Sequence, residues 1–278
     1  MTQITASMVK ELREETKVGM MECKKALQES GGDKAAAVKL LRERGVVIAG
    51  KKASRKASEG MIDAAILDEG KAGVMIEVNC ETDFVTRNDT FKDFVKYLLE
   101  KAKTTGDNEL AEVEKDALVA KVAEIGENLV IGRNIRFEVE NEGLVASYIH
   151  LGGKVGVLVE LSLEKAETAG KELVKELAKD LTLHIAASAP QYLDSSEVPQ
   201  DVIDAERAIY AKQMEDKPAN ILDKIIEGKI NKFYSQICFV DQGFVKDPDQ
   251  KIVDLVASVG KQVDDTIVIK RYARFQIG

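Results

Sequence analysis

The chain has 278 residues and a formal charge of −8, from 40 Lys and Arg against 48 Asp and Glu. This length allows two or three units with cores of their own and excludes a single-motif protein. The acidic balance argues against nucleic acid as a partner, no apolar run reaches the roughly 20 residues that cross a bilayer, and residues 1–5 lack the pattern of an export signal.

Residues 1–54 have the pattern of three short helices followed by a linker. Thr5 is placed to cap the first helix and Asp33 to cap the third. The second helix is expected to end at a Gly-Gly pair and the third at Gly45. The basic stretch 51–58 is predicted to be a linker or a solvated helical extension. The expected core of this unit is the apolar face of each helix: Met8, Val9, Leu12, Met20, Met21, Ala26, Leu27, Ala37, Leu40 and Leu41.

From Gly60 onward the sequence repeats itself at an offset of 83 residues, which carries Gly60 onto Gly143. Each copy predicts two strands around a Gly-Lys turn, and therefore a β-hairpin: 61–67 with 72–79, and 144–150 with 155–161. A helical pattern follows each hairpin and can cover one of its faces. Its apolar positions are Phe91, Phe94, Val95 and Leu98 after the first copy, and Leu173, Leu177, Leu181 and Ile185 after the second.

Each copy closes with a further strand, and there the offset grows to 138 residues, from Val130 to Val268. The second copy therefore contains an insertion. A helix opened by Pro199, a turn at Lys217 and Pro218 and a return helix predict an antiparallel helical hairpin at about residues 198–237, projecting from the body. The matched residues of the closing strands are Val130, Ile131, Arg133, Arg136 and Phe137, and Val268, Ile269, Arg271, Arg274 and Phe275.

The chain is therefore predicted to have an α+β fold in three parts. Residues 1–54 form the N-terminal three-helix domain and its linker. Residues 55–140 form a first subdomain of hairpin, helix and strand. Residues 141–278 form a second, related subdomain that carries the helical hairpin. Such an elongated arrangement suits contact with a large partner better than enclosure of a small molecule.

Side chains of the usual catalytic and metal-binding types are few. The chain has two histidines and three separated cysteines, Cys23, Cys80 and Cys238. These are too few for a disulfide framework, and no spaced Cys/His cluster or glycine-rich phosphate loop occurs. His184 lies on a helical stripe and is expected in or near the core. A cytosolic protein that works by binding is predicted.

One segment combines polar and aromatic residues at the predicted corner between the first hairpin and its helix. In one interpretation Thr82 caps the helix, Asp83 interacts with its dipole and Phe84 plugs the junction. In the other, Phe84 is exposed and anchors a partner protein. The second copy lacks the Asp-Phe pair, which favours a special role for Phe84. The segment is Asn79-Cys80-Glu81-Thr82-Asp83-Phe84-Val85, and its counterpart is Leu163, Glu164, Lys165, Ala166 and Glu167.

With this segment the chain resembles the bacterial elongation factor Ts family, the guanine-nucleotide exchange factors of elongation factor Tu, over essentially its whole length. Glu22 and Gly243 depart mildly from the family pattern. The resemblance implies a fold similar to the ubiquitin-associated domain for the N-terminal helices. The other signatures that carry the resemblance are Gly19-Met20-Met21 with Cys23-Lys24-Lys25-Ala26-Leu27, then Ile125-Gly126-Glu127-Asn128, and Phe244-Val245-Lys246-Asp247-Pro248.

The resemblance also implies nucleotide exchange without covalent catalysis. The corner would enter the GTPase domain of elongation factor Tu, with Phe84 as a wedge, so that Mg²⁺ is displaced and GDP leaves. We therefore expect no cofactor, no direct contact with the nucleotide, no nucleic acid and no membrane. The expected location is the cytoplasm. The residues assigned to Mg²⁺ displacement in the partner are Thr82, Asp83, Phe84 and Val85.

Four further residues are assigned to partner binding by the same resemblance. Lys24 would face the GTPase domain, Ile125 and Gly126 would support the contact around the wedge, and His150 would meet a more distant domain. Each has a plain structural alternative: Lys24 as a solvated helix residue, Gly126 as a helix C-cap, and His150 as a strand residue with a satisfied ring.

Two other classes of function remain open at this point. An RNA-binding protein would depend on the basic stretch 51–58 and on the arginines of the closing strands. An acid/base hydrolase would need Glu81 and Asp83 paired in an apolar pocket with raised pKa values, and Phe84 buried beside them.

Overall fold

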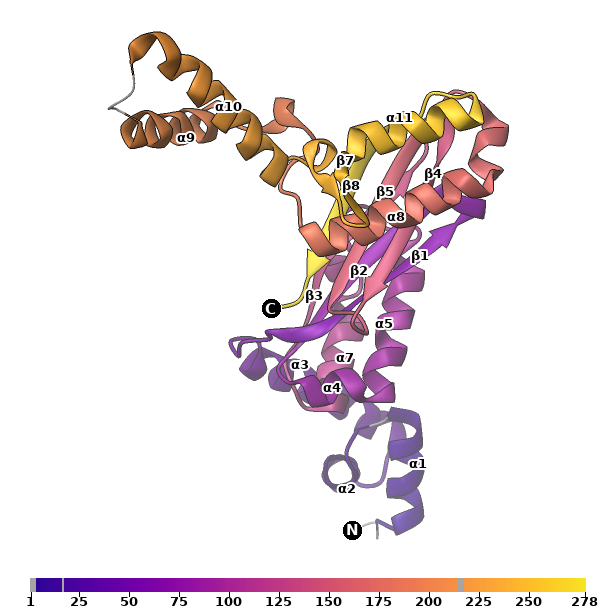
Figure 1. Cartoon of the computed structure of the whole chain (residues 1–278). Helices are drawn as coiled ribbons and strands as arrows, with labels where there is room; N and C mark the ends of the chain where they lie inside the picture. Colours follow the sequence, from indigo (N-terminus) through magenta and orange to yellow (C-terminus); the bar gives the residue numbers. More distant parts are fainter. Residues whose placement is uncertain (1–3, 17, 215–217) are drawn as a thin grey trace.

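The computed structural model describes residues 4–16, 18–214 and 218–278. Residues 1–3, part of the segment that lacks the pattern of an export signal, and Lys217, at the expected turn of the helical hairpin, lie outside the described residues. Figure 1 presents an elongated molecule with a helical unit at one end, sheets and helices in the middle, and a pair of helices projecting from the body. The fold mixes helices with small antiparallel sheets.

Three helices make up the N-terminal unit: α1 (Ala6–Thr16), α2 (Met20–Glu29) and α3 (Lys34–Lys52). Both expected caps are confirmed. The Thr5 hydroxyl accepts the N–H of Met8 at 3.3 Å, and the Asp33 carboxylate accepts the N–H of Ala36 at 3.1 Å. Their small core consists of Val9, Leu12, Cys23, Ala26, Leu27, Ala37 and Leu41.

Two expectations for this unit were wrong. The third helix does not end at Gly45 but runs on to Lys52, because this part of α3 packs against α7 (Lys115–Ile125): Gly45 is buried, and a Cβ there would be in ordinary contact, 3.6 Å, with that of Ala123. Met20 and Met21 are exposed rather than buried, because they form the first turn of α2, and the face of that helix turned to the core is carried by later residues.

The first module is an antiparallel sheet in the order β1 (Glu59–Leu67), β2 (Ala72–Cys80) and β3 (Leu129–Glu138), covered by helices. The helices are α4 (Asp83–Arg87), α5 (Asp89–Ala102), α6 (Leu110–Val113) and α7. As the helical pattern predicted, Phe91, Phe94, Val95 and Leu98 of α5 are buried. They pack against the face of β2 formed by Val74, Ile76, Val78 and Cys80.

The second module has the same order in β4 (Glu142–His150), β5 (Val155–Leu163) and β8 (Val268–Gln276), with α8 (Glu172–Ser188) and α11 (Ile252–Val263) against it. Both predicted hairpins are confirmed. Even the register is repeated: Gly73 stands opposite Phe137, and Gly156 stands opposite Phe275. Short 3-10 turns occur at Asp68–Gly70, Ala166–Gly170, Ser195–Glu197 and Phe239–Asp241.

The two sheets pack on each other through equivalent residues. A Cβ at Gly73 would lie 2.7 Å from Val145 Cγ1, and one at Gly156 would lie 2.4 Å from Ile62 Cγ2, so both glycines permit the close approach. At the edge of this contact the aromatic partners are exchanged: Arg133 of the first module lies over the ring of Phe275, and Arg271 of the second lies over Phe137. The shared core contains Ile62, Met75, Phe137, Val145, Leu158 and Phe275.

The insertion in the second module contains the two expected helices, α9 (Gln200–Gln213) and α10 (Ala219–Ile237), which directly follow Pro199 and Pro218. They share a small core of their own and project from the body (Figure 1). A short hairpin, β6 (Gly243–Phe244) with β7 (Asp247–Lys251), leads from them into α11. Among the helices of the described residues, none combines the length and apolar character needed to cross a membrane.

Candidate functional site

The corner between β2 and α5 presents an aromatic side chain to solvent. Phe84 is 76 % exposed, more than any other large hydrophobic residue in the described part of the chain. Its neighbour Val85 is buried in the core of the first module. The five-residue helix α4 is therefore held to the module by Val85 while Phe84 points outward. An exposed ring at this position cannot plug the junction, so the burial alternative for Phe84 is wrong.

The acid next to the aromatic also faces solvent. Asp83 begins α4, where a negative charge interacts favourably with the helix dipole. Its carboxylate accepts a hydrogen bond from Arg87, one turn later, at 2.9 Å. The Arg87 side chain is largely exposed and that of Asp83 is about half exposed, so this pair contributes little to stability. Asp83 and Phe84 together form an acidic, aromatic projection at the surface.

Thr82 does not cap α4, in contrast to our expectation. Its backbone is extended, and its side chain donates instead to Glu127, which follows α7 in the sequence. The Thr82 N–H lies 3.0 Å from Glu127 Oε2 and the Thr82 hydroxyl 2.6 Å from Oε1. Just before it, burial raises the pKa of the Cys80 thiol to about 12, so the thiol stays protonated and donates to the Thr82 carbonyl.

Glu81 ties the corner to the segment after α7 and to the basic stretch after α3. Its carboxylate accepts the N–H of Asn128 at 2.6 Å and lies 3.5 Å from the guanidinium of Arg55. The hydrogen bond from Asn128 lowers the pKa of Glu81, and the charge of Arg55 adds to the effect. The Asn128 side chain in turn donates to the Arg55 carbonyl at 2.8 Å.

Ile125 and Gly126, which we assigned to partner binding, therefore lie next to the corner. Gly126 ends α7 in the left-handed conformation, with φ of +85°, and its N–H bonds to Val122. It is thus the C-cap that the plain alternative described. It is also exposed, and its carbonyl accepts a hydrogen bond from Lys52 at the end of α3. The cap places this exposed turn beside the aromatic projection.

His150 belongs to the second module but lies at the same end of the molecule as the corner. It ends β4, and the turn that follows it carries Lys154, which forms an ion pair with Glu59. Glu59 stands opposite Cys80 in the sheet, directly before the corner. The His150 ring is exposed, and its Nδ1 lies 2.8 Å from the Tyr148 hydroxyl.

Lys24 is the assigned residue that belongs to neither module. It lies on α2 and is exposed. Figure 1 places the N-terminal unit beyond the end of the body that carries α4. The structure therefore gathers the corner, the turn after α7 and the turn after β4 at one end, with Lys24 on the separate unit next to that end.

Comparison with known proteins identifies the family. The sequence profile described as Elongation factor TS matches residues 81–278, beginning within the corner segment. Elongation factor Ts of Trichlorobacter lovleyi is 43 % identical over 99 % of this chain and 93 % of its own length. Those of Clostridium acetobutylicum and Nitratidesulfovibrio vulgaris are 43 % and 41 % identical over 99 % of this chain and 92 % and 96 % of theirs. The chain belongs to the elongation factor Ts family.

Membership in the elongation factor Ts family supports a role as a nucleotide-exchange factor in translation elongation. The arginines of the closing strands, on which an RNA-binding role would depend, make contacts within the chain. Arg133 and Arg271 pair with Glu77 and Glu160 at 2.7 and 2.6 Å, so both are committed to partners within the chain. Arg274 donates to a backbone carbonyl in the same way.

The conditions for an acid/base hydrolase are contradicted. Such a site would need a carboxyl group with a raised pKa, whereas the pKa of Glu81 is lowered. It would also need Phe84 buried, whereas the ring is exposed. The buried histidine, His184, is engaged on both ring nitrogens, with Gln242 at 2.8 Å and the Val245 N–H at 3.2 Å. The expectation that His184 is a core residue is confirmed.

Sequence reasoning missed Leu151, the neighbour of His150. It is 72 % exposed and adopts a left-handed conformation, with φ of +49°, at the tip of the second hairpin. Asp68 occupies the same place in the first hairpin, with φ of +50°. An apolar residue in a turn where the repeat has an acid is the signal that could have identified it. Leu151 adds an exposed apolar side chain to the surface beside His150.

Proposed function

We propose that this protein binds GDP-loaded elongation factor Tu and promotes GDP release by displacing Mg²⁺. Phe84 is the wedge that enters the GTPase domain, with Thr82, Asp83 and Val85 forming the corner that carries it. Lys24, Ile125, Gly126 and His150 extend the contact. The exposure of Phe84 beside an acid, on a helix anchored by the core, is the observation that carries the proposal, because aromatic residues often dominate binding energy at protein interfaces.

The mechanism follows from linkage between two ligands of one protein. A bound Mg²⁺ neutralises phosphate charge and fixes the nucleotide, so its loss weakens GDP binding. The factor needs only to bind the nucleotide-free partner more tightly than the GDP-bound partner. Each ligand then weakens the other by the same factor, and a fresh nucleotide releases the exchange factor. No covalent step and no direct contact with GDP is required.

The division of the chain is part of this proposal. The domain at residues 1–54, with a fold like the ubiquitin-associated domain, would present Lys24 to the GTPase domain. The subdomain at residues 55–140 would carry the wedge, and the subdomain at residues 141–278 would bring His150 to a second domain of the partner. The corner and the turn that follows His150 lie together at one end of the body, and the N-terminal unit lies beyond that end, so these surfaces would meet adjacent domains of one partner.

The test is the release of fluorescent GDP from elongation factor Tu with the Phe84→Ala variant. Release at subsaturating factor is expected to slow by a factor of about 30, since an anchoring aromatic contributes about 2 kcal/mol or more. Glu167→Ala removes the exposed side chain at the same place of the second module and is the matched control, with wild-type release expected. Wild-type release with Phe84→Ala would refute the proposal.

The role of Mg²⁺ has a separate measurement. When Mg²⁺ is removed by a chelator, the partner alone should release GDP quickly, and the additional acceleration by the factor should shrink. A factor that accelerates release equally with and without Mg²⁺ would act by another route.

A further inference from the structure

The projection of Phe84 depends on how firmly the turn beneath it is held. Because the ring is exposed, its own packing does little to fix its position. The turn is held instead by Glu127, whose two carboxylate oxygens receive the N–H and the hydroxyl of Thr82 at 3.0 and 2.6 Å. We call this pair of hydrogen bonds the corner clamp. It joins residues 45 positions apart, two residues before the ring.

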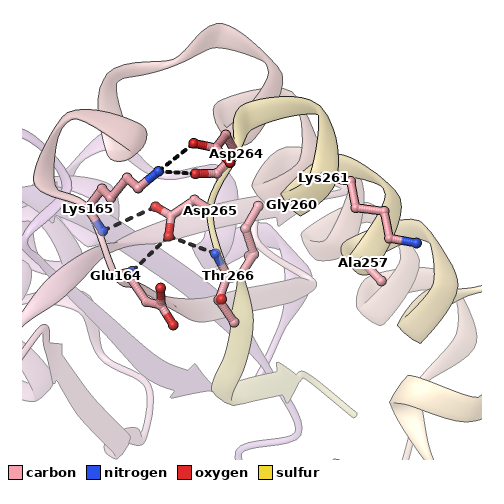
Figure 2. Close-up of a pocket in the computed structure, with 9 residues that line it drawn as sticks. Glu164, Lys165, Ala257, Gly260, Lys261, Asp264, Asp265 and Thr266 are labelled. Carbon is pink, nitrogen blue, oxygen red and sulfur yellow. Dashed lines mark hydrogen bonds and ion pairs between the residues drawn. The ribbon is translucent and has the colours of Figure 1, made fainter.

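The second module has a clamp at the equivalent place, as Figure 2 shows. The offset of 83 carries Thr82 onto Lys165, and the offset of 138 carries Glu127 onto Asp265. One oxygen of Asp265 accepts the Lys165 N–H at 3.2 Å, and the other accepts the Glu164 N–H at 3.1 Å. A carboxylate after the last helix therefore holds the strand-to-helix turn in both modules.

The turn before each carboxylate is repeated as well. Gly126 ends α7, and Asp264 ends α11, both in the left-handed conformation. In the second module, Lys165 also pairs with Asp264 at 2.8 Å, which raises the pKa of the lysine and lowers that of the acid. These groups line an open pocket (Figure 2), and their charges are paired with one another.

The two corners differ in what the clamp supports. In the second module the position of Phe84 is taken by Glu167, and no aromatic projects there. In the first module the clamp lies directly under the wedge. A ring that is already held in its binding position loses less conformational freedom when a partner closes around it, so binding is stronger. Loosening the turn should weaken the wedge without removing it.

We propose that Glu127 is a positioning residue for nucleotide exchange, which acts through Thr82 to hold Phe84 in the orientation that enters the partner. This inference rests on the proposed function and adds a residue to it. Glu127 itself needs no contact with elongation factor Tu. Because Asp265 holds the equivalent turn through two backbone N–H groups and carries no wedge, the chain contains its own control.

The test measures fluorescent GDP release from elongation factor Tu with the full-length chain. Glu127→Ala removes both acceptors and is expected to slow stimulated release about fivefold to tenfold. Glu127→Gln is expected to retain most of the stimulation, because its amide oxygen can accept the Thr82 N–H and its NH₂ group can donate to the Thr82 hydroxyl. Asp265→Ala breaks the equivalent clamp and is expected to leave release unchanged.

A second readout follows the ring in the free protein. The chain contains no tryptophan, so Phe84→Trp places a single tryptophan at the wedge, which can be excited selectively over the six tyrosines. Its time-resolved anisotropy should show faster local motion when Glu127→Ala is added, and no change when Asp265→Ala is added. A folding defect alone would instead lower the melting temperature, which circular dichroism records for each variant.

Three outcomes would overturn the inference. Glu127→Ala could release GDP as fast as Asp265→Ala, or Glu127→Gln could be as slow as Glu127→Ala, which would assign the effect to the charge. The third outcome is that Glu127→Ala slows GDP release by the same factor in a Thr82→Val background as in the wild type. Glu127 would then not act through Thr82. If Glu127→Ala does not fold, Thr82→Val alone, with an expected slowing of about twofold to threefold, decides in its place.

The two hypotheses can fail separately. If Phe84→Ala releases GDP at the wild-type rate, the wedge hypothesis is refuted. The anisotropy experiment on the clamp remains valid, because it needs no partner. If Phe84→Ala slows GDP release but Glu127→Ala changes neither the release rate nor the mobility of the ring, the wedge hypothesis stands and the clamp has no part in the mechanism.

Discussion

The two modules of this chain share a framework and differ in what each exposes. Strand order, register and the bulge at Glu77 and Glu160 are the same in both, and a carboxylate holds the equivalent corner in each. The exposed features differ: Phe84 projects from one corner and Glu167 from the other, and Leu151 stands at one hairpin tip where Asp68 stands at the other. The comparison teaches that repeated residues maintain the fold, whereas unmatched exposed residues are the candidates for contact with a partner.

The largest loss of stability is expected from substitutions of the glycines between the two sheets. Gly73→Ala and Gly156→Ala each place a methyl group under 3 Å from a branched side chain of the opposite module. Each should lower the free energy of unfolding by about 1–3 kcal/mol, because overpacking forces both sheets to shift. Chemical denaturation measures this. Gly170→Ala, where a methyl group meets open space, is the control, and a loss equal to that of Gly73→Ala would contradict the explanation.

A smaller effect is expected from the buried histidine of the second module, which replaces the exposed Lys101 of the first. Burial lowers the pKa of His184 below its ordinary 6.5, although the hydrogen bond to Gln242 opposes this. The unfolded chain then binds the proton more readily than the folded one. Stability from this group is complete above about pH 6.5 and declines as the pH falls below that value.

The measurement is the melting temperature between pH 7.5 and pH 5.5. The wild type should lose on the order of 1 kcal/mol over this interval, since one pH unit corresponds to about 1.36 kcal/mol for each proton taken up. In His184→Asn this part of the pH dependence should disappear, and in His150→Gln, which changes the exposed histidine, it should remain. An unchanged pH dependence in His184→Asn would assign it to other groups.

The smallest effect on the stability of the body is expected from removal of the helical hairpin, which the first module lacks. The helices α9 and α10 pack mainly on each other, around a core of their own. Replacement of residues 200–235 by a short Gly-Ser linker should therefore leave a cooperative melting transition within a few degrees of the wild type. Differential scanning calorimetry tests this, and a broad transition without cooperativity would show that the hairpin belongs to the main core.

Much of the fold could be predicted from the sequence because the repeat appears twice and constrains itself. The strands of both hairpins and the buried face of α5 follow from periodicity and the matched glycines. The end of α3 could not be predicted, because Gly45 has the signal of a helix end, and the packing of α3 on α7 beyond that point is a tertiary contact between distant segments.

The site divides in the same way. Phe84 was identifiable because its repeat partner is not aromatic. The bond between Thr82 and Glu127 was not, because a Thr before a helix predicts a cap, and the competing acceptor lies 45 residues away. Likewise, the approach of the turn after His150 to the first corner depends on how the sheets stack, which local patterns do not encode.

The exchanged contacts of Arg133 with Phe275 and Arg271 with Phe137 relate the two halves as a twofold axis relates the subunits of a dimer. In an assembly of identical subunits, any substitution is copied to both ends. Joining the halves in one polypeptide removes this restriction, so one hairpin turn can carry the apolar Leu151 while the other carries the acidic Asp68. The covalent connection therefore gives a nearly symmetric object a front and a back, and with them a single direction of approach to another protein.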